Sequence, residues 1–139
     1  IAQAGILVTK VIRNKKTKDK NFIIVDAAMN NLIRPTMYDA YHKIVHVEQN
    51  DNTKITADIV GPICETGDYL ALNRSINYVD NNKFLAIMTA GAYSSVMSSN
   101  YNARSDAIEI LIANNKDHQI KKVDSIKEII AKEKLINFD

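Results

Sequence analysis

The sequence TADIVGPICETGD, residues 56–68, joins a predicted strand to a loop that carries the only cysteine of the chain. Residues 56–60 are apolar and partly β-branched, which favours a β-strand. A glycine–proline pair then ends the strand, and a glycine–aspartate pair is typical of a closing turn. We therefore predict a strand that runs directly into a rigid loop presenting Cys64 and Glu65.

The adjacent Cys64 and Glu65 indicate two chemical tasks. A neighbouring carboxylate disfavours a thiolate, so the Cys64 side chain is expected to remain a thiol that can donate a proton. The carboxylate of Glu65 can hold a cationic amine. The alternative for a lone cysteine is a small buried hydrophobe, and the remaining sequence has to decide between the two.

Length and composition limit the class of protein. A chain of 139 residues has room for one domain with its own core. Its 18 basic and 16 acidic side chains give a formal net charge of +2, so no nucleic-acid or anionic-membrane partner is expected. No apolar run approaches the roughly 18 residues that a membrane span needs. A single cysteine excludes an internal disulfide and suits a reducing cytoplasm.

Short apolar segments separated by polar turns predict a mostly β fold. Strands are predicted at residues 4–12, 22–27, 43–48, 56–60, 84–89 and 107–112. The last of these is expected to pair with residues 119–123. Residues 125–132 have the apolar period of a helix, with Asp124 as its N-cap. The predicted fold is a small β-barrel or sandwich with a short C-terminal helix.

The segment around Arg34 combines a guanidinium with a phenol. Pro35 favours the opening of a single helical turn, in which Arg34 and Tyr38 would project to one side because they are four residues apart. A guanidinium fork and a phenol hydroxyl together can bind a carboxylate. The alternative is a surface arginine beside a packed tyrosine.

Tyr93 lies where the predicted strand 84–89 breaks at Gly91 and enters a serine-rich segment. Such a break is a place where a ligand can meet backbone amides. The alternative is that Tyr93 packs in the core beside Val96 and Met97. His42 and His46 would share one face of a strand, but two histidines do not complete a metal site, and no metal is expected.

Three segments together resemble one known family. They are Arg34–Tyr38, Gly61–Asp68, and Ala90–Tyr93 running on to Asn100–Arg104. In this order and spacing they are similar to the C-terminal domain of diaminopimelate decarboxylase, and the resemblance extends from Gly5 to about Ile112. Members of this family are pyridoxal-phosphate enzymes of fold type III, which pair an N-terminal α/β barrel with a C-terminal β-barrel.

The resemblance implies that residues 1–139 are the C-terminal β-barrel domain of such an enzyme. The chain begins with Ile1 rather than Met, and we expect it to be a piece of a longer protein. The N-terminal barrel, with the Schiff-base lysine, would be absent, and the fragment alone would be inactive. The implied cofactor is pyridoxal 5′-phosphate. The implied reaction converts meso-2,6-diaminopimelate to L-lysine and carbon dioxide in lysine biosynthesis. A cytoplasmic homodimer is also implied, with the active site at the subunit interface and the cysteine loop reaching into the partner's site.

The resemblance implies a role for each candidate residue. Arg34 and Tyr38 resemble the pair that holds the distal carboxylate of the substrate. Cys64 resembles the acid that protonates the carbon from which carbon dioxide has left, and Glu65 resembles the group that binds the distal ammonium. Tyr93 resembles the residue that contacts both the cofactor phosphate and the substrate.

Two other functions stay open. Relatives of the ornithine type typically have aspartate after the cysteine, so Glu65 together with Arg34 favours diaminopimelate over ornithine or arginine. A β-barrel binding module without catalysis is the second alternative.

Overall fold

The computed structural model describes residues 1–49, 51–134 and 136 of the chain. These residues belong to two compact units, Ile1–Ser98 and Ser99–Asp139. None of the helices in the described ranges is long and apolar enough to cross a membrane.

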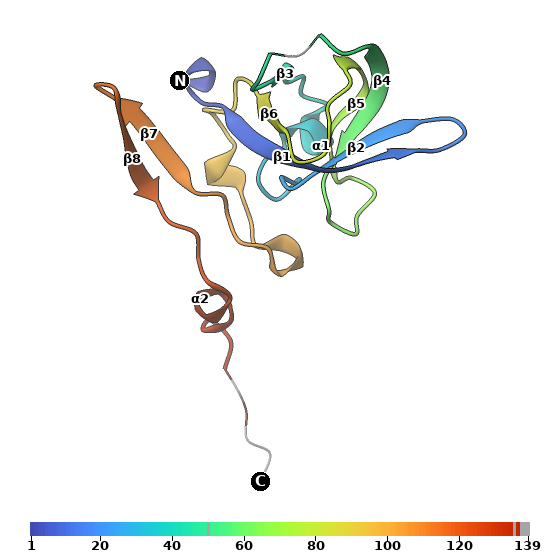
Figure 1. The fold of residues 1–139 in the computed structure, drawn as a ribbon. Coiled ribbons are helices and arrows are strands. Elements are labelled where there is room, and N and C mark those ends of the chain that lie inside the picture. The colour runs from blue at the N-terminus through green and yellow to red at the C-terminus, as the bar shows by residue number, and fades with distance from the viewer. Residues whose placement is uncertain (50, 135, 137–139) are drawn as a thin grey trace. The chain divides into compact units, whose positions relative to one another are not determined.

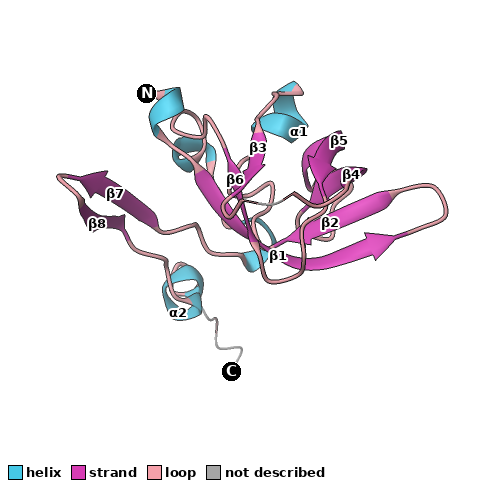
Figure 2. Ribbon diagram, turned by 45° about the horizontal axis from the view of Figure 1, so that its top comes forward, coloured by secondary structure: helices cyan, strands magenta, loops and turns pink. Residues whose placement is uncertain are grey.

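The first unit is built almost entirely from strands (Figures 1 and 2). Its short helical elements are η1 (Ala2–Ala4), α1 (Arg34–Tyr38) and η2 (Ser95–Met97). Its strands are β1 (Leu7–Lys16), β2 (Asn21–Val25), β3 (Ile44–His46), β4 (Lys54–Val60), β5 (Tyr69–Asn77) and β6 (Phe84–Ile87). The predicted strands are therefore confirmed with shifted ends, and β5 is an addition that the sequence did not predict.

The strands form one six-stranded sheet in the order β3-β6-β1-β2-β4-β5. All neighbours are antiparallel except β2 and β4, which are parallel. The long strand β1 pairs with β6 through its first half and with β2 through its second half, and its register shifts between Val11 and Arg13. Such an irregularity bends a strand. The sheet curls into a barrel-like arrangement (Figure 1), which confirms the predicted fold class.

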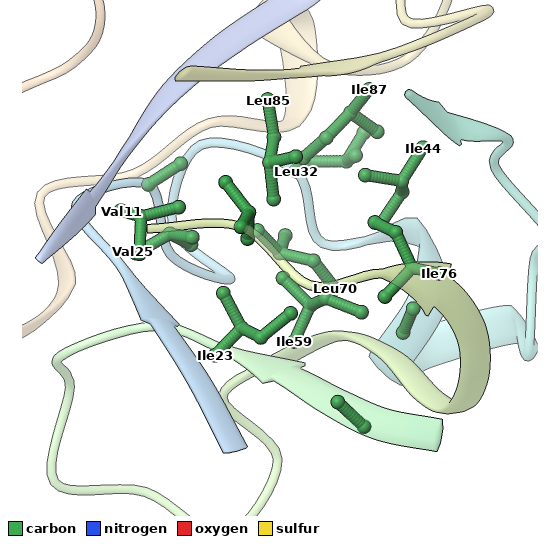
Figure 3. Packing of buried hydrophobic residues seen from close by; sticks show 14 residues of the cluster. Val11, Ile23, Val25, Leu32, Ile44, Ile59, Leu70, Ile76, Leu85 and Ile87 are labelled. Carbon is green, nitrogen blue, oxygen red and sulfur yellow. The ribbon is translucent and has the colours of Figure 1, made fainter. Parts of the chain in front are cut away.

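Apolar side chains from all parts of this sheet fill its interior (Figure 3). Alternation along each strand directs every second residue inward. The fully buried apolar residues include Val11, Ile23, Val25, Leu32, Ile59, Leu70, Leu85 and Ile87. Full burial of one such side chain stabilises the fold by about 1.5–3 kcal/mol. The loops that carry the candidate residues are therefore flanked by strands whose side chains pack in one shared core.

Strand β5 departs from a regular strand pattern, because the polar run Asn73–Ser75 interrupts it. Asn73 has a φ of 48°, and the pairing of β5 with β4 shifts register near this point. The buried carboxylate of Asp58 accepts the Asn73 backbone N–H at 2.6 Å. A side chain on β4 thus fixes the irregular backbone, and apolar periodicity does not report such a contact.

The second unit contains η3 (Tyr101–Ala103), a β-hairpin and a short helix. The predicted hairpin is confirmed, as β7 (Glu109–Ala113) pairs antiparallel with β8 (Lys116–Lys121). The helix α2 (Ile126–Ile130) is shorter than predicted, and its N-cap is Ser125 instead of Asp124. The Ser125 hydroxyl accepts the Glu128 N–H, and the Glu128 carboxylate accepts the Ser125 N–H. This reciprocal capping box explains the difference, because Asp124 has no glutamate three residues after it.

Candidate functional site

The helix α1 is the single turn that the sequence predicted. Buried Pro35 occupies its first turn, and Asp39 ends it in the left-handed conformation, with its N–H donating to the carbonyl of Arg34. A fixed φ at the start and a left-handed residue at the end confine the helix to five residues. Arg34 and Tyr38 are therefore its first and last residues.

The side chains of Arg34 and Tyr38 differ in their exposure and are alike in lacking a polar partner within the described part of the chain. Arg34 is half-buried and Tyr38 is 59% exposed, so the alternative of a packed tyrosine is wrong. Within the described ranges, the Arg34 guanidinium and the Tyr38 hydroxyl have no hydrogen-bond or ion-pair partner. A guanidinium without a partner presents its full set of donors to an incoming carboxylate.

The Gly61–Asp68 loop connects β4 to β5 and is closed at its base by Asp68. The buried Asp68 carboxylate accepts the Ile63 N–H at 2.6 Å, and the Gly61 N–H donates to the Asp68 carbonyl at 3.1 Å. A β-carbon at position 61 would collide with this carboxylate, which explains the glycine. Cys64 stands exposed beyond this base, so the alternative of a buried hydrophobic cysteine is wrong.

Glu65 is exposed beside Cys64, and the loop orients its carboxylate. One of its oxygens accepts the Gly67 N–H at 3.1 Å, and its carbonyl accepts the Asp68 N–H at 3.0 Å. Backbone and side chain of Glu65 are thus both engaged by the same turn. The thiol and the carboxylate are presented together by a loop with internal hydrogen bonds, as the sequence predicted.

Two hydrogen bonds connect this loop to the segment that carries α1. The Thr36 hydroxyl donates to the Gly67 carbonyl at 2.5 Å, and the second carboxylate oxygen of Asp68 accepts the Met29 N–H at 2.7 Å. The structure therefore brings the Arg34–Tyr38 helix and the Cys64–Glu65 loop together, although they are about thirty residues apart in the chain.

Tyr93 lies on a turn after β6 that has an unusual backbone. Tyr93 has a φ of 62° and Thr89 has a φ of 63°, both in the left-handed region that non-glycine residues rarely adopt. The turn is held by the Ala90 N–H, which donates to the Gly5 carbonyl at 2.8 Å, and by the Ser94 hydroxyl, which donates to the Ala90 carbonyl at 2.7 Å. Strain of this kind persists only where the surroundings enforce it.

Core packing of Tyr93, the alternative for this residue, is wrong, because Tyr93 is 62% exposed and Val96 is 82% exposed. Within the described residues, no hydrogen bond or ion pair joins Tyr93 to α1 or to the Cys64 loop. The structure therefore pairs the first two candidate segments and leaves Tyr93 on a separate turn. The rest of the third segment, Asn100–Arg104, belongs to the second unit.

Two residues that shape the site, Thr36 and Arg74, carry no signal in the sequence. Arg74 of β5 donates to the His42 carbonyl at 2.8 Å, and its guanidinium lies 4.1 Å from the Tyr41 ring centroid. This contact fastens the segment after α1 to β5. Thr36 and Arg74 are ordinary surface residue types, so only the folded arrangement identifies them.

The two histidines do not share a strand face as the sequence predicted. His42 precedes β3 and is buried, with Nδ1 3.0 Å from the Met88 carbonyl. His46 ends β3, and its Nε2 lies 3.0 Å from the Asn77 carbonyl. One nitrogen of each ring thus lies beside a backbone carbonyl, while the buried Nε2 of His42 has no hydrogen-bond partner among the described residues. Among the described residues, no group of three or more His, Cys, Asp or Glu side chains is arranged to hold a metal ion.

Comparison with known proteins reveals close relatives. The family model "Pyridoxal-dependent decarboxylase, C-terminal sheet domain" matches residues 2–91. The diaminopimelate decarboxylases of Zymomonas mobilis and Aquifex aeolicus are 48% and 50% identical to this chain, over 99% and 94% of its length. The chain spans only 32% and 31% of the length of those two proteins.

Solved structures agree with these matches. A crystal structure from Aquifex aeolicus superposes with a TM-score of 0.92 at 50% identity, covering 94% of this chain and 32% of that one. The diaminopimelate decarboxylase of M. jannaschii in complex with L-lysine superposes with a TM-score of 0.93 at 33% identity, covering 97% and 31%. The fold, the matched segments and these relatives agree, and the chain belongs to the family of C-terminal sheet domains of pyridoxal-dependent decarboxylases.

Proposed function

We propose that this chain is the C-terminal part of a diaminopimelate decarboxylase, which converts meso-2,6-diaminopimelate to L-lysine and carbon dioxide. The observation that carries the proposal is the hydrogen bond between Thr36 and Gly67, which joins the helix that carries the unpartnered Arg34 guanidinium to the loop that carries the exposed Cys64 and Glu65. The relatives that cover nearly the whole chain at 48% and 50% identity support it. Since the chain spans about a third of their length, the remaining two-thirds would supply the rest of the active site.

The distal end of diaminopimelate is itself an amino acid, with an ammonium and a carboxylate. In the proposed complex the Arg34 guanidinium and the Tyr38 hydroxyl bind that carboxylate. The exposed Glu65 carboxylate binds the ammonium. Charge-assisted hydrogen bonds of this kind are among the strongest in proteins, and each substrate charge meets an opposite one. The two ends of the substrate are thereby distinguished.

Cys64 is the proposed proton donor. Cys64 is exposed on a loop that Asp68 closes, so its backbone is held in place while its thiol stays accessible. A positioned acid is required after carbon dioxide has left, because the carbon that lost the carboxylate must gain a proton on one face.

The residues of this chain fit a role beside a phosphate-bearing cofactor. The Tyr93 hydroxyl is exposed on a fixed turn and has no partner among the described residues, as a donor to a phosphate oxygen requires. Pyridoxal phosphate, when bound, supplies an electron sink for the charge left by the departing carboxylate. Tyr93 would help to hold and orient it. The Schiff-base lysine is expected in the N-terminal part and not among the lysines of this chain.

The same geometry leaves a decarboxylase for another basic amino acid as the second candidate. Lysine/ornithine decarboxylase from Vibrio vulnificus shares the fold with a TM-score of 0.68 at 22% identity. The proposed role of Arg34 favours diaminopimelate over this candidate, because ornithine and lysine have no distal carboxylate for a guanidinium to bind. The alternative of a binding module without catalysis offers no role for the exposed Cys64.

The test uses the full-length decarboxylase that carries this chain. Carbon dioxide release is measured with diaminopimelate, ornithine and arginine, and we expect turnover of diaminopimelate alone. Cys64→Ala should lower kcat by roughly two to four orders of magnitude, the range for loss of a general acid, and leave the cofactor absorbance unchanged. Thr66→Ala, at an exposed neighbour on the same loop, is the matched control and should retain turnover.

Ornithine turnover equal to that of diaminopimelate would overturn the proposed substrate, and full activity of Cys64→Ala would remove Cys64 from the mechanism.

We further propose that the enzyme is a cytoplasmic homodimer. A single exposed cysteine suits a reducing compartment. Light scattering of the full-length protein should give twice the mass of one chain, and a monomer that is fully active would contradict this part.

A further inference from the structure

Thr36 contacts Gly67 through both its hydroxyl and its methyl group. The hydroxyl of Thr36 donates to the Gly67 carbonyl at 2.5 Å. Its methyl group lies where a side chain at position 67 would begin, since a β-carbon added to Gly67 would be 2.8 Å from the Thr36 Cγ2. Thr36 therefore contacts the loop in two ways, by a hydrogen bond from its hydroxyl and by packing of its methyl group.

Both partners of this contact are themselves held in place. Thr36 lies in the middle of α1, between Arg34 and Tyr38, and α1 is fixed at both ends by Pro35 and by left-handed Asp39. Gly67 lies between Glu65 and Asp68, whose hydrogen bonds close the loop. A displacement of either segment must therefore carry the other with it.

We propose that Thr36 is a positioning residue that sets substrate specificity. Its contact with Gly67 holds the Arg34–Tyr38 carboxylate grip and the Cys64–Glu65 loop in one fixed relation. Ligands that bear both an ammonium and a carboxylate at their distal end are then bound better than ligands that bear the ammonium alone. Because the contact lies within one chain, it acts on every site to which that chain contributes. This inference rests on the function proposed above.

L-lysine and cadaverine make the test specific, because they differ by one carboxylate. L-lysine retains the distal amino-acid end of diaminopimelate, whereas cadaverine has only the ammonium. Inhibition constants for both are measured with the full-length decarboxylase and its Thr36→Val variant. Thr36→Val removes the hydroxyl at nearly constant volume, and it should weaken L-lysine about fivefold, the effect of one lost neutral hydrogen bond. Cadaverine should change less than about twofold.

Two matched variants separate positioning from general damage. Thr36→Ser keeps the hydroxyl and should stay within about twofold of the parent for both ligands. Thr56→Val repeats the same chemical change at an exposed position on β4 and should alter neither constant. Equal losses for both ligands in Thr36→Val would mean that Thr36 is only structural, and the proposal would be overturned.

The packing side of the contact gives an independent test. Gly67→Ala should weaken L-lysine selectively, because the new methyl group pushes α1 away from the loop. In the double variant Gly67→Ala/Thr36→Ser the obstructing Cγ2 is absent, so the serine should restore L-lysine binding. Urea unfolding of the same four proteins should show the same non-additivity without any ligand.

The outcomes distinguish the two proposals. If the parent neither decarboxylates diaminopimelate nor binds L-lysine, the proposed function fails. The urea unfolding of the four proteins then tests only whether Thr36 and Gly67 are in contact. If the parent is active and Gly67→Ala is not rescued by Thr36→Ser, the positioning role fails. If rescue occurs in unfolding but the L-lysine to cadaverine ratio never moves, the contact exists without setting specificity, which also overturns the proposal.

Discussion

The two units of this chain keep their apolar side chains in opposite places. In the first unit Ile59, Leu70 and Leu85 are at most 1% exposed and share one core. In the second unit Ile112 of β7 is 70% exposed and Ile126 of α2 is 74% exposed, and α2 has no buried residue. Elements of the first unit are thus held by a common interior, and those of the second by local contacts.

Those local contacts are polar. Lys121 makes ion pairs with Asp106 at 3.0 Å and with Glu109 at 3.6 Å, and Lys122 pairs with Glu128 at 2.5 Å. Surface ion pairs contribute little, typically less than about 1 kcal/mol each. The comparison teaches that residues which need a fixed geometry belong on the unit with the core. All five candidate residues, Arg34, Tyr38, Cys64, Glu65 and Tyr93, are indeed on the first unit.

The largest expected difference between the units is in backbone hydrogen exchange. Amides in the centre of β4 and β5 should exchange only on global unfolding, whereas those of β8 should open locally, since an isolated two-stranded hairpin is marginally stable. We expect at least about a thousandfold slower exchange in β4 and β5, measured by NMR on the 139-residue chain. Equal protection in β8 would break the comparison and reveal a shared core for both units.

Truncation of matched isoleucines tests the same contrast by stability. Ile59→Ala leaves a cavity in the core and should lower the free energy of unfolding by about 2–5 kcal/mol. Ile112→Ala removes the same atoms from an exposed strand and should change it by no more than about 0.5 kcal/mol. Urea unfolding of both variants measures the difference. A large loss for Ile112→Ala would show that its side chain is covered in solution.

The sequence predicted those parts of the molecule that local chemistry determines. Pro35 indicated the single turn of α1, and glycine and proline around Cys64 indicated a loop with the thiol exposed on it. Both features depend on backbone preferences of neighbouring residues. The same reasoning placed the hairpin of the second unit, where Asn114 and Asn115 adopt the positive φ of its turn.

The sequence could not predict what depends on distant partners. The middle of strand β5 is a polar run, so its sequence does not look like a strand. Its shape depends on the hydrogen bond from the Asn73 N–H to Asp58 of β4, fifteen residues earlier in the chain. Tyr93 adopts a positive φ in a turn that is held partly by hydrogen bonds to the distant N-terminal residues Ala2 and Gly5. The contact of Thr36 with Gly67 connects two segments that are distant in the chain, and neither sequence indicates the other as its partner. Tertiary contacts of this kind override local propensity.

Variants of Asp58 measure how much a buried polar contact in the first unit contributes to the free energy of unfolding. This contribution can be compared with that of the surface ion pairs in the second unit. Its carboxylate is buried and binds both the Asn73 N–H at 2.6 Å and the Lys20 ammonium at 2.8 Å. Asp58→Ala leaves the Asn73 N–H without an acceptor, and we expect a loss of about 1–3 kcal/mol in urea unfolding. Lys20→Met removes a half-exposed partner and should cost at most about 1 kcal/mol. Equal losses would mean that the ion pair, and not the fixed bend of β5, is what Asp58 provides.

The smallest expected effect is a pH dependence confined to α2. The Lys122 ammonium, followed by the backbone and hydroxyl of Ser125, lowers the pKa of the exposed Glu128 carboxyl from 4.5 to about 2. A group with a lowered pKa in the folded state stabilises it above the ordinary value, and the contribution is lost as the pH falls through the folded value. The helical NMR shifts of residues 126–130 should therefore weaken between pH 4.5 and about 2.

Glu128→Gln should abolish this pH dependence, whereas Glu133→Gln, beyond the helix, should preserve it. High salt should move the Glu128 midpoint upward, because exposed charges are screened. A midpoint near 4.5 in the parent would show that Lys122 and Ser125 do not hold the carboxylate in solution. The helix would then lack its main local support, and the contrast with the first unit, whose strands share one core, would become sharper still.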